Sequence, residues 1–288
     1  FYGDYGIPIR VTKKSNLFSK QSKYKFVEVY DTVEFGKMLL EDGAVSLVEK
    51  EEPYYHEMIA HVPMMSFPEA KRVLVIGGGD GGVVQQLLKH ENIEEIVVAE
   101  LDDLLVQAAK THFPGLASAL TNPKVKLVIT ESQEYLKSTK DGSFDVIIVD
   151  EIDPADRRQF DETGVQLFCT AFWKECHRVL GENGVIVSPS RSPTTESNDF
   201  KLFFKELAGI FGKNNVKPYI FENATNGMMS FAFISKGKID NAETFVGAEK
   251  ANEFAEKHNL FYYDGEMHYA SFVLPKKYRR MLADTEIS

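Results

Sequence analysis

The chain has 288 residues, of which 43% are hydrophobic, and this length suits one large α/β domain with a smaller appendage. Its 33 basic and 43 acidic residues give a formal charge of −10, which argues against nucleic acid or an anionic membrane as a partner and favours cationic ligands. No apolar run approaches the roughly 20 residues of a membrane helix, and residues 1–20 lack the pattern of a signal peptide, so a soluble, cytoplasmic protein is expected.

The N-terminal part of the chain has the alternating pattern of a small antiparallel sheet. Lys25–Tyr30 and Lys37–Leu40 have the period of half-buried strands, and the turn Glu41-Asp42-Gly43 joins the latter to Ala44–Val48. We therefore predict a β-hairpin domain over residues 1–52 and a catalytic domain over residues 53–288.

The second domain begins with a helical segment and continues as alternating strands and helices. Residues 54–62 have helical periodicity, and residues 63–69 are predicted to form a linker. Five strand candidates then alternate with helical patterns, which predicts an α/β domain with a mainly parallel sheet of the Rossmann type, and two more resemble a closing antiparallel hairpin. The candidates are Arg72–Ile76, Glu95–Ala99, Val125–Thr130, Phe144–Val149, Val185–Ser188, Val216–Phe221 and Met228–Ser235.

A glycine-rich turn follows the first of these strands. The spacing fits both the dinucleotide fingerprint G-x-G-x-x-G and the G-x-G-x-G of methyltransferase-like domains. The glycines concerned are Gly77, Gly79 and either Gly82 or Gly81. Asp80 lies within the turn, where its carboxylate would repel a pyrophosphate but suit a cationic ligand, such as a sulfonium nucleoside with an amine tail.

Acidic residues follow four successive strand candidates. In a parallel sheet the carboxyl ends of the strands share one edge, and ligands bind there. Glu100 lies at the same edge as Asp80, and its position 19 residues after Gly81 (100 − 81) suits binding to a ribose diol. Glu131 also lies at this edge and could bind an adenine amino group. Asp150 ends the fourth strand, whereas Asp145, at the start of that strand, is interpreted as structural.

The chain resembles the polyamine aminopropyltransferases, the spermidine synthase family, over nearly its whole length. The segments that carry the resemblance are Ser22-Lys-Tyr24, Tyr55-His-Glu-Met-Ile-Ala-His-Val-Pro63, Gly77-Gly-Gly-Asp-Gly-Gly82, Leu88-Lys-His90, Ala99-Glu-Leu-Asp102, Asp150-Glu-Ile-Asp-Pro154 and Ala270-Ser-Phe-Val-Leu-Pro275. The resemblance implies transfer of an aminopropyl group from decarboxylated S-adenosylmethionine to an amine, putrescine by default, with release of methylthioadenosine. It also implies no further cofactor, no metal, and a homodimer or homotetramer.

The resemblance also implies roles for individual residues. Asp80 would hold the terminal ammonium of the donor within the turn formed by Gly77, Gly79 and Gly81, while Glu100 would bind its ribose, Glu131 its adenine side, and His56 would line the same site. Asp150 and Tyr55 would position and deprotonate the attacking amine, with Asp153 beside the acceptor channel.

Several departures from the family pattern cluster on the acceptor side. Two small hydroxyl residues usual in the family are replaced by Glu151 and Ile152, and the following loop carries Arg157 and Arg158, which would be solvent-exposed or would address a carboxylate on the acceptor. A Tyr-Pro-Ser-Gly segment common in the family aligns with residues 224–227, so its tyrosine is missing. These departures leave open a different or modified acceptor and a non-catalytic regulatory paralogue. A methyltransferase that uses intact S-adenosylmethionine is a further alternative, although Asp80 would not complement the extra carboxylate of that donor.

Two other features of the sequence have structural interpretations. His56, Glu57 and His61 form H-E-x-x-x-H, one residue longer than the zinc motif H-E-x-x-H, so no metal site is predicted. The two cysteines, Cys169 and Cys176, lie in a predicted helix and are expected to be buried without forming a disulfide.

Overall fold

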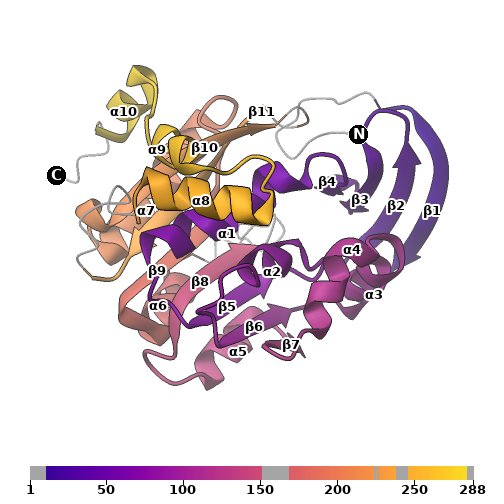
Figure 1. Cartoon of the computed structure of the whole chain (residues 1–288), viewed down its shortest axis with the longest axis horizontal. Coiled ribbons are helices and arrows are strands. Elements are labelled where there is room, and N and C mark those ends of the chain that lie inside the picture. Colours follow the sequence, from indigo (N-terminus) through magenta and orange to yellow (C-terminus); the bar gives the residue numbers. More distant parts are fainter. Residues whose placement is uncertain (1–10, 151–168, 224, 226, 238–245, 284–288) are drawn as a thin grey trace, which may run out of the picture.

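The computed structural model describes residues 11–150, 169–223, 225, 227–237 and 246–283. An N-terminal sheet and a larger sheet lie side by side, joined by the helix that follows the first sheet (Figure 1). The N-terminal sheet has four antiparallel strands, in the order β1 (Lys13–Gln21), β2 (Phe26–Thr32), β3 (Gly36–Glu41) and β4 (Ala44–Val48). Its β3–β4 turn has positive φ angles at Asp42 (49°) and Gly43 (83°), as a two-residue type I′ hairpin requires.

The larger sheet has seven strands and confirms the predicted Rossmann-like architecture. Their order is β10 (Val216–Asn223), β11 (Gly227–Ser235), β9 (Leu180–Ser190), β8 (Phe144–Asp150), β5 (Arg72–Gly77), β6 (Glu95–Glu100) and β7 (Val125–Ile129). The strands from β9 to β7 are mutually parallel, while β11 pairs antiparallel with β9 and with β10, which is the predicted closing hairpin.

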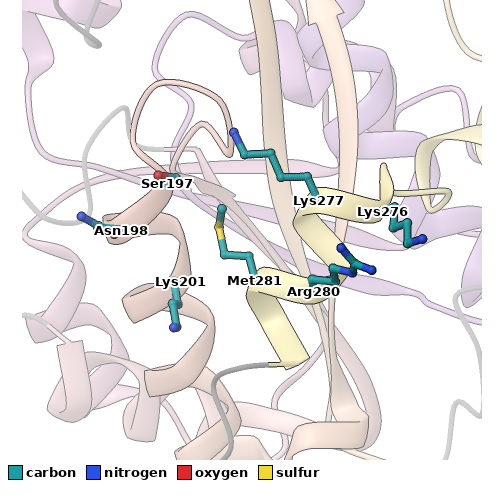
Figure 2. Close-up of a pocket in the computed structure, with 7 residues that line it drawn as sticks. All are labelled: Ser197, Asn198, Lys201, Lys276, Lys277, Arg280 and Met281. Carbon is teal, nitrogen blue, oxygen red and sulfur yellow. The ribbon is translucent and has the colours of Figure 1, made fainter.

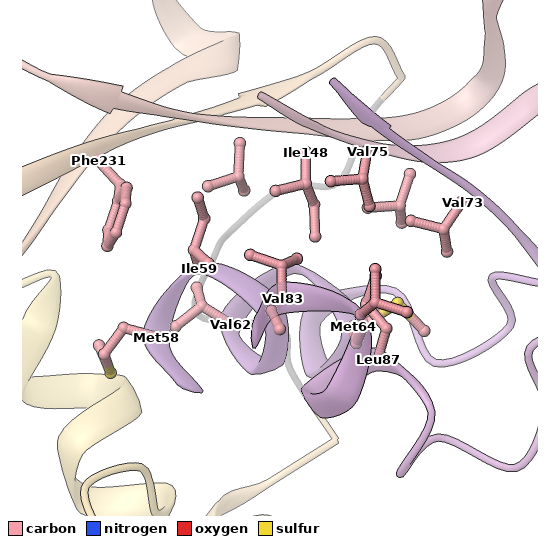
Figure 3. Packing of buried hydrophobic residues seen from close by; sticks show 14 of the residues in the cluster. Met58, Ile59, Val62, Met64, Val73, Val75, Val83, Leu87, Ile148 and Phe231 are labelled. Carbon is pink, nitrogen blue, oxygen red and sulfur yellow. The ribbon is translucent and has the colours of Figure 1, made fainter. Parts of the chain in front are cut away.

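Apolar residues alternate between the two faces of this sheet, and helices cover both faces. The first face packs on α1 (Glu52–Ser66), α2 (Gly82–Leu87) and α8 (Ala248–His258), with Val73, Val75 and Ile148 pointing towards Met58, Ile59 and Val83 (Figure 3). The opposite face packs on α5 (Ser132–Ser138), α6 (Cys169–Val179) and α7 (Ser197–Phe211). This α6 helix holds both cysteines, and Cys176 is fully buried as expected.

The remaining elements connect the two sheets or close the chain. The helix α3 (Asp103–His112) packs on the first sheet through Leu105 and Ala108. The others are α4 (Pro114–Ala117), the 3₁₀ turns η1 (Ser118–Thr121) and η3 (Lys213–Asn215), α9 (Gly265–Ser271) and α10 (Lys276–Ala283).

The prediction of a linker over residues 63–69 is wrong, because α1 continues to Ser66 with Pro63 inside it. A proline within a helix costs about 3 kcal/mol, but burial of a large apolar side chain returns about 1.5–3 kcal/mol. Met64 and Met65 are both almost completely buried here, which offsets the cost of the proline. The chain leaves the helix only at Phe67, whose N–H donates to the carbonyl of Pro63.

Two strands also differ from the sequence prediction. The polar strand β1 was not predicted as a separate strand, because eight of its nine residues are exposed and it is held by pairing with β2 rather than by burial. Strand β9 begins at Leu180, five residues before the predicted start at Val185, and its pairing with β8 is irregular between Phe144 and Val146.

Candidate active site

The glycine-rich turn lies where the strand order of the larger sheet reverses. The chain passes from β5 outward to β6 and β7, then returns to the other side of β5 to form β8, which is the arrangement at which open α/β sheets bind ligands. Positive φ angles at Gly77 (81°), Gly78 (76°) and Gly81 (87°) let the chain turn sharply from β5 into α2. The turn therefore places backbone and side chains from neighbouring strands around one point.

Asp80 within this turn belongs to a chain of three ionisable side chains. Its Oδ1 accepts the N–H of Gly82 at 2.7 Å, and its Oδ2 lies 3.7 Å from Nε2 of His56. The other ring nitrogen of His56, Nδ1, lies 2.6 Å from Oε2 of Glu52, one helical turn earlier in α1. Helix α1 thus aims an imidazole at the carboxylate of the glycine turn.

The charges in this chain of side chains determine the protonation state of His56. Burial alone would lower the pKa of His56, but the charge of Asp80, the hydrogen bonds and the charge of Glu52 outweigh burial and raise this pKa well above 6.5. Burial would likewise raise the pKa of Asp80, yet the charge of His56 holds it below its usual value. At neutral pH His56 is therefore an imidazolium, and it lies beside the ionised carboxylate of Asp80.

The ring of His56 occupies the space beside a glycine. A Cβ added to Gly82 would lie 2.0 Å from Cε1 of His56, so no larger residue fits without moving the ring. Gly82 therefore lets α1 and the start of α2 approach closely enough for His56 to reach Asp80.

Glu100, at the end of β6, reaches the same turn. It is 6% exposed, and its Oε2 accepts the N–H of Gly79 at 3.1 Å while its Oε1 accepts the N–H of Asp102 at 2.8 Å. A Cβ at Gly79 would lie 2.8 Å from Oε2, so the absence of a side chain there is what admits the carboxylate. The structure thus brings Glu100 against the glycine turn, as the sequence predicted.

Asp150 reaches the turn from the opposite side. It ends β8 and pairs with Gly77 of β5, and a Cβ at Gly78 would lie 3.3 Å from its Oδ2. Asp145 lies at the other end of the same strand and accepts the N–H groups of Lys71 and Arg72, which confirms its structural interpretation. The two carboxylates of β8 thus have separate tasks.

Tyr55 is held beside His56 by aromatic packing. Its ring meets Phe231 edge-on at 5.2 Å between ring centroids, Phe221 at 6.1 Å and the imidazole of His56 at 5.6 Å. These phenylalanines belong to the closing hairpin of the sheet, so β10 and β11 position the N-terminal end of α1.

Glu131 has a structural task that the sequence did not predict. It is the N-cap of α5, and its two carboxylate oxygens accept the N–H groups of Gln133 at 3.1 Å and Glu134 at 2.9 Å. It follows β7 at the carboxyl edge, where Ile129 pairs with Glu100, so its place in the sheet agrees with the prediction while its hydrogen bonds are those of a cap.

Parts of the predicted acceptor region lie outside the described residues. These are Asp153, Glu151, Ile152, Arg157, Arg158, Ala224 and Asn226. Thr225, in the segment that lacks the tyrosine, is buried, and its N–H and hydroxyl both donate to Oε2 of Glu51, at 3.2 and 2.5 Å. A residue from the β10–β11 turn is therefore tied to the start of α1.

Three contacts around the candidate site were missed from the sequence. Glu52 precedes His56 by four residues, and that i, i+4 spacing was the available signal. Ser22, in the Ser-Lys-Tyr segment, donates to Oδ2 of Asp102 at 2.5 Å and so ties the N-terminal sheet to the start of α3. The carboxylate of Glu57 accepts the N–H groups of three consecutive residues, 261–263, at 2.8 to 2.9 Å, and nothing local in the sequence indicates this contact.

Comparisons with known proteins show the family to which the chain belongs. A family model described as the spermine/spermidine synthase domain matches residues 52–243, and one described as the spermidine synthase tetramerisation domain matches residues 4–49. The chain belongs to the spermine/spermidine synthase family. It is 35% identical to a polyamine aminopropyltransferase of Thermotoga petrophila, over 92% of this chain and 86% of that one, and 35% identical to one of Clostridioides difficile, over 95% and 93%.

Solved structures of spermidine synthases have the same fold as this chain. One, in complex with the transition-state analogue AdoDATO, has a TM-score of 0.87 and 32% identity, covering 98% of this chain and 93% of that one. A second, from Thermotoga maritima, has a TM-score of 0.86, also at 32% identity, covering 98% and 92%. This member of the spermine/spermidine synthase family is accordingly a transferase. Across the described part of the chain, no helix is long and apolar enough to cross a membrane.

The glycine turn of this spermidine synthase relative leads to a prediction about stability. At Gly81, φ is 87° and an added Cβ would lie 2.6 Å from the backbone oxygen of Leu116. We expect Gly81→Ala to lower the free energy of unfolding by about 2–4 kcal/mol, because backbone strain and overpacking add. Urea unfolding measures the loss. Gly115→Ala is the matched control, since nothing lies within 4 Å of its added Cβ, and an equal loss in both variants would contradict the assignment.

The second histidine of the H-E-x-x-x-H segment faces away from the site. Nδ1 of His61 lies 2.9 Å from Nε2 of His90, and its Nε2 lies 3.2 Å from Oε1 of Gln86. Burial lowers the pKa of His61 well below 6.5, and burial together with nearby His258 and Lys89 lowers that of His90 to about 3. The pair is therefore neutral in the folded protein and serves packing in this spermidine synthase fold.

This pair predicts a loss of stability in acid. The pKa of His90 is about 6.5 in the unfolded chain and about 3 in the folded protein. Between these two pH values the unfolded chain therefore binds more protons than the folded protein. The contribution of His90 to stability is fully present above about pH 6.5 and is lost as the pH falls towards about 3. We expect His90→Gln to lose less stability than the parent between about pH 7.5 and about pH 5, measured by urea unfolding. His177→Gln serves as a comparison with a smaller expected effect, because burial lowers the pKa of the half-buried His177 in the same direction as that of His90 but less far. Equal losses in parent and His90→Gln would refute the prediction.

Proposed function

We propose that the chain transfers the aminopropyl group of decarboxylated S-adenosylmethionine to an amine, with putrescine as the default acceptor, and releases methylthioadenosine. The observation that best supports this is the placement of Asp80, Glu100 and Asp150 against one glycine turn at the switch point of the sheet. Three carboxylates around one point suit a pair of cationic substrates rather than an anionic nucleotide.

On the donor side, Asp80 binds the terminal ammonium of the aminopropyl group. The imidazolium of His56, held by Glu52, fixes the carboxylate of Asp80. Glu100 accepts the ribose hydroxyls, and the backbone of Gly77, Gly79 and Gly81 lines the turn. Glu131 faces the adenine side from the end of β7.

On the acceptor side, Asp150 and Tyr55 position the attacking amine. The amine has a pKa of about 10 in solution and attacks only after it loses a proton, so a carboxylate beside it both binds the ammonium and accepts that proton. The nitrogen then displaces the sulfur at the adjacent carbon in line, and the sulfonium leaves as the neutral thioether of methylthioadenosine. Holding both substrates in this orientation supplies much of the rate. Asp153 belongs to the same acceptor channel.

The reaction needs no cofactor beyond the donor itself, and we propose neither a metal, nor nucleic acid, nor a membrane as a partner. We further propose that the chain works as a cytoplasmic homodimer or homotetramer. The match of residues 4–49 to a tetramerisation domain supports assembly through the N-terminal sheet.

The acceptor side supports a second candidate, in which the acceptor is a different or modified amine. Glu51 and Thr225 form a buried contact where the family usually has its Tyr-Pro-Ser-Gly segment, so the wall of the acceptor channel differs at that point. A non-catalytic regulatory paralogue is the remaining alternative.

One experiment distinguishes these candidates. Purified protein is incubated with decarboxylated S-adenosylmethionine and, separately, putrescine, cadaverine, agmatine, spermidine or a carboxylated amine, and mass spectrometry detects methylthioadenosine and the adduct. Spermidine from putrescine is the expected product, and an adduct with another amine supports the second candidate. Donor binding without any product would contradict the proposed activity and support the regulatory paralogue.

A further inference from the structure

A surface pocket of about 500 Å³ lies between α7 and α10, and it shares no residue with the proposed active site. Figure 2 shows α7 contributing one wall and α10 the other, with Lys277 and Met281 extending from α10 towards the first turn of α7. The lining residues are Ser197, Asn198, Lys201, Lys276, Lys277, Arg280 and Met281.

The charge of this pocket is opposite to that of the chain as a whole. Four of its seven lining residues are cationic and none is acidic, although the chain carries ten more acidic than basic residues. Within the described residues, none of these four cations forms an ion pair. Exposed lysines elsewhere do, such as Lys71 with Glu94 and Lys257 with Glu91, each at 2.7 Å.

The cations on α10 are also placed unfavourably for the helix itself. Lys276 and Lys277 occupy its first turn, which holds no acidic residue, and positive charge at a helix N-terminus opposes the helix dipole. Arg280 follows Lys276 by four residues, and like charges at that spacing destabilise a helix. A bound anion would relieve both effects.

The α7 side of the pocket is formed by the first residues of that helix. Its N-cap residue, Glu196, makes no side-chain capping hydrogen bond, so the first N–H groups of this 15-residue helix are not capped in that way. Ser197, Asn198 and Lys201 share the helix face that lines the pocket, whereas Asp199 in the same turn does not line it. The first turn of α7 and Lys201 therefore line the same pocket as the cations of α10.

We propose that this pocket binds a polyphosphate anion, the triphosphate or diphosphate group of a small molecule. Four cations match the three to four negative charges of such a group, and helix N-termini bind phosphate readily. A volume of about 500 Å³ lies within the range of small-molecule sites, roughly 300–1,000 Å³. This site is independent of the proposed transfer reaction, because it involves none of the groups that hold the donor or the acceptor.

Calorimetric titration of the purified chain with tripolyphosphate tests the proposal, in magnesium-free buffer at low and at moderate salt. Tripolyphosphate lacks a base and a ribose, so it does not compete for a nucleoside site. We expect saturable binding with one site per chain, weakened about ten-fold in the double variant Lys277→Ala/Arg280→Ala. Saturating methylthioadenosine should leave this binding unchanged.

The matched control is Lys174→Ala/Lys250→Ala, which removes two exposed cations from α6 and α8, away from the pocket. Binding within two-fold of the parent is expected for this control. No saturable binding, or an equal loss in both double variants, would overturn the proposal and show only nonspecific attraction of anions. Adenosine triphosphate and inorganic phosphate are then titrated separately. Binding of adenosine triphosphate shows that a nucleotide can occupy the pocket, and binding of inorganic phosphate shows that a single phosphate group is enough. If neither of them binds and tripolyphosphate does not bind either, the proposal is overturned.

Discussion

Replacing Asp150 with Asn is expected to lower kcat by about 10²–10⁴-fold, because the amide cannot accept the proton of the attacking amine. The substitution preserves the shape of the side chain at the end of β8, where residue 150 pairs with Gly77, so the glycine turn should keep its form. Donor binding should therefore change little. Steady-state kinetics with each substrate varied, and calorimetric titration with the donor, measure the two effects separately.

Asp145→Asn is the matched control for this prediction. It makes the same chemical change on the same strand, but at the amino end, where Asp145 accepts the N–H groups of Lys71 and Arg72 at 2.8 Å. An asparagine oxygen can still accept those bonds, so kcat within about two-fold of the parent is expected once folding is verified by thermal unfolding. Full turnover in Asp150→Asn would show that another group accepts the proton.

Replacing Asp80 with Asn is expected to weaken binding of decarboxylated S-adenosylmethionine by about 10–100-fold, since a hydrogen bond between charged groups is worth about 1.5–3 kcal/mol. The asparagine oxygen can still accept the N–H of Gly82, which preserves the turn. Loss of one of its two carboxylate neighbours should also lower the pKa of His56. Calorimetric titration measures the affinity for the donor.

Methylthioadenosine provides a control ligand within the same experiment. It has the nucleoside of the donor but lacks the aminopropyl ammonium, so its affinity for Asp80→Asn should stay within about two-fold of the parent value. Glu100→Gln should instead weaken the binding of both ligands, because both carry the ribose. If Asp80→Asn weakens both ligands equally, Asp80 does not act on the ammonium.

Much of the fold followed from local patterns in the sequence. The strands of the larger sheet are apolar because helices cover both faces of the sheet. Each strand begins and ends no more than five residues from its predicted bounds. The errors occur where a nonlocal contact outweighs a local signal. Pro63 suggested a helix end, but burial of Met64 and Met65 carries α1 past it, and the polar strand β1 exists only through its pairing with β2.

The candidate site was predicted in part, for a related reason. The topology of a parallel sheet brings strand ends together, so Asp80, Glu100 and Asp150 follow from strand order alone. The i, i+4 spacing of Glu52 and His56 was a local signal for their contact, whereas the approach of His56 to Asp80 depends on how α1 packs against the glycine turn. The capping bonds of Glu131 depend on where α5 begins.

The contact between Glu57 and residues 261–263 constrains the order in which this protein can complete its fold during synthesis. The two partners are 204 to 206 positions apart, and the carboxylate is only 3% exposed. Until the ribosome has released the segment after Leu260, the buried carboxyl group of Glu57 lacks these three backbone donors, so we expect the helix that carries Tyr55 and His56 not to settle in its final position. We therefore expect α1 to be among the last elements completed, and a nascent chain that ends before this segment to lack the active site.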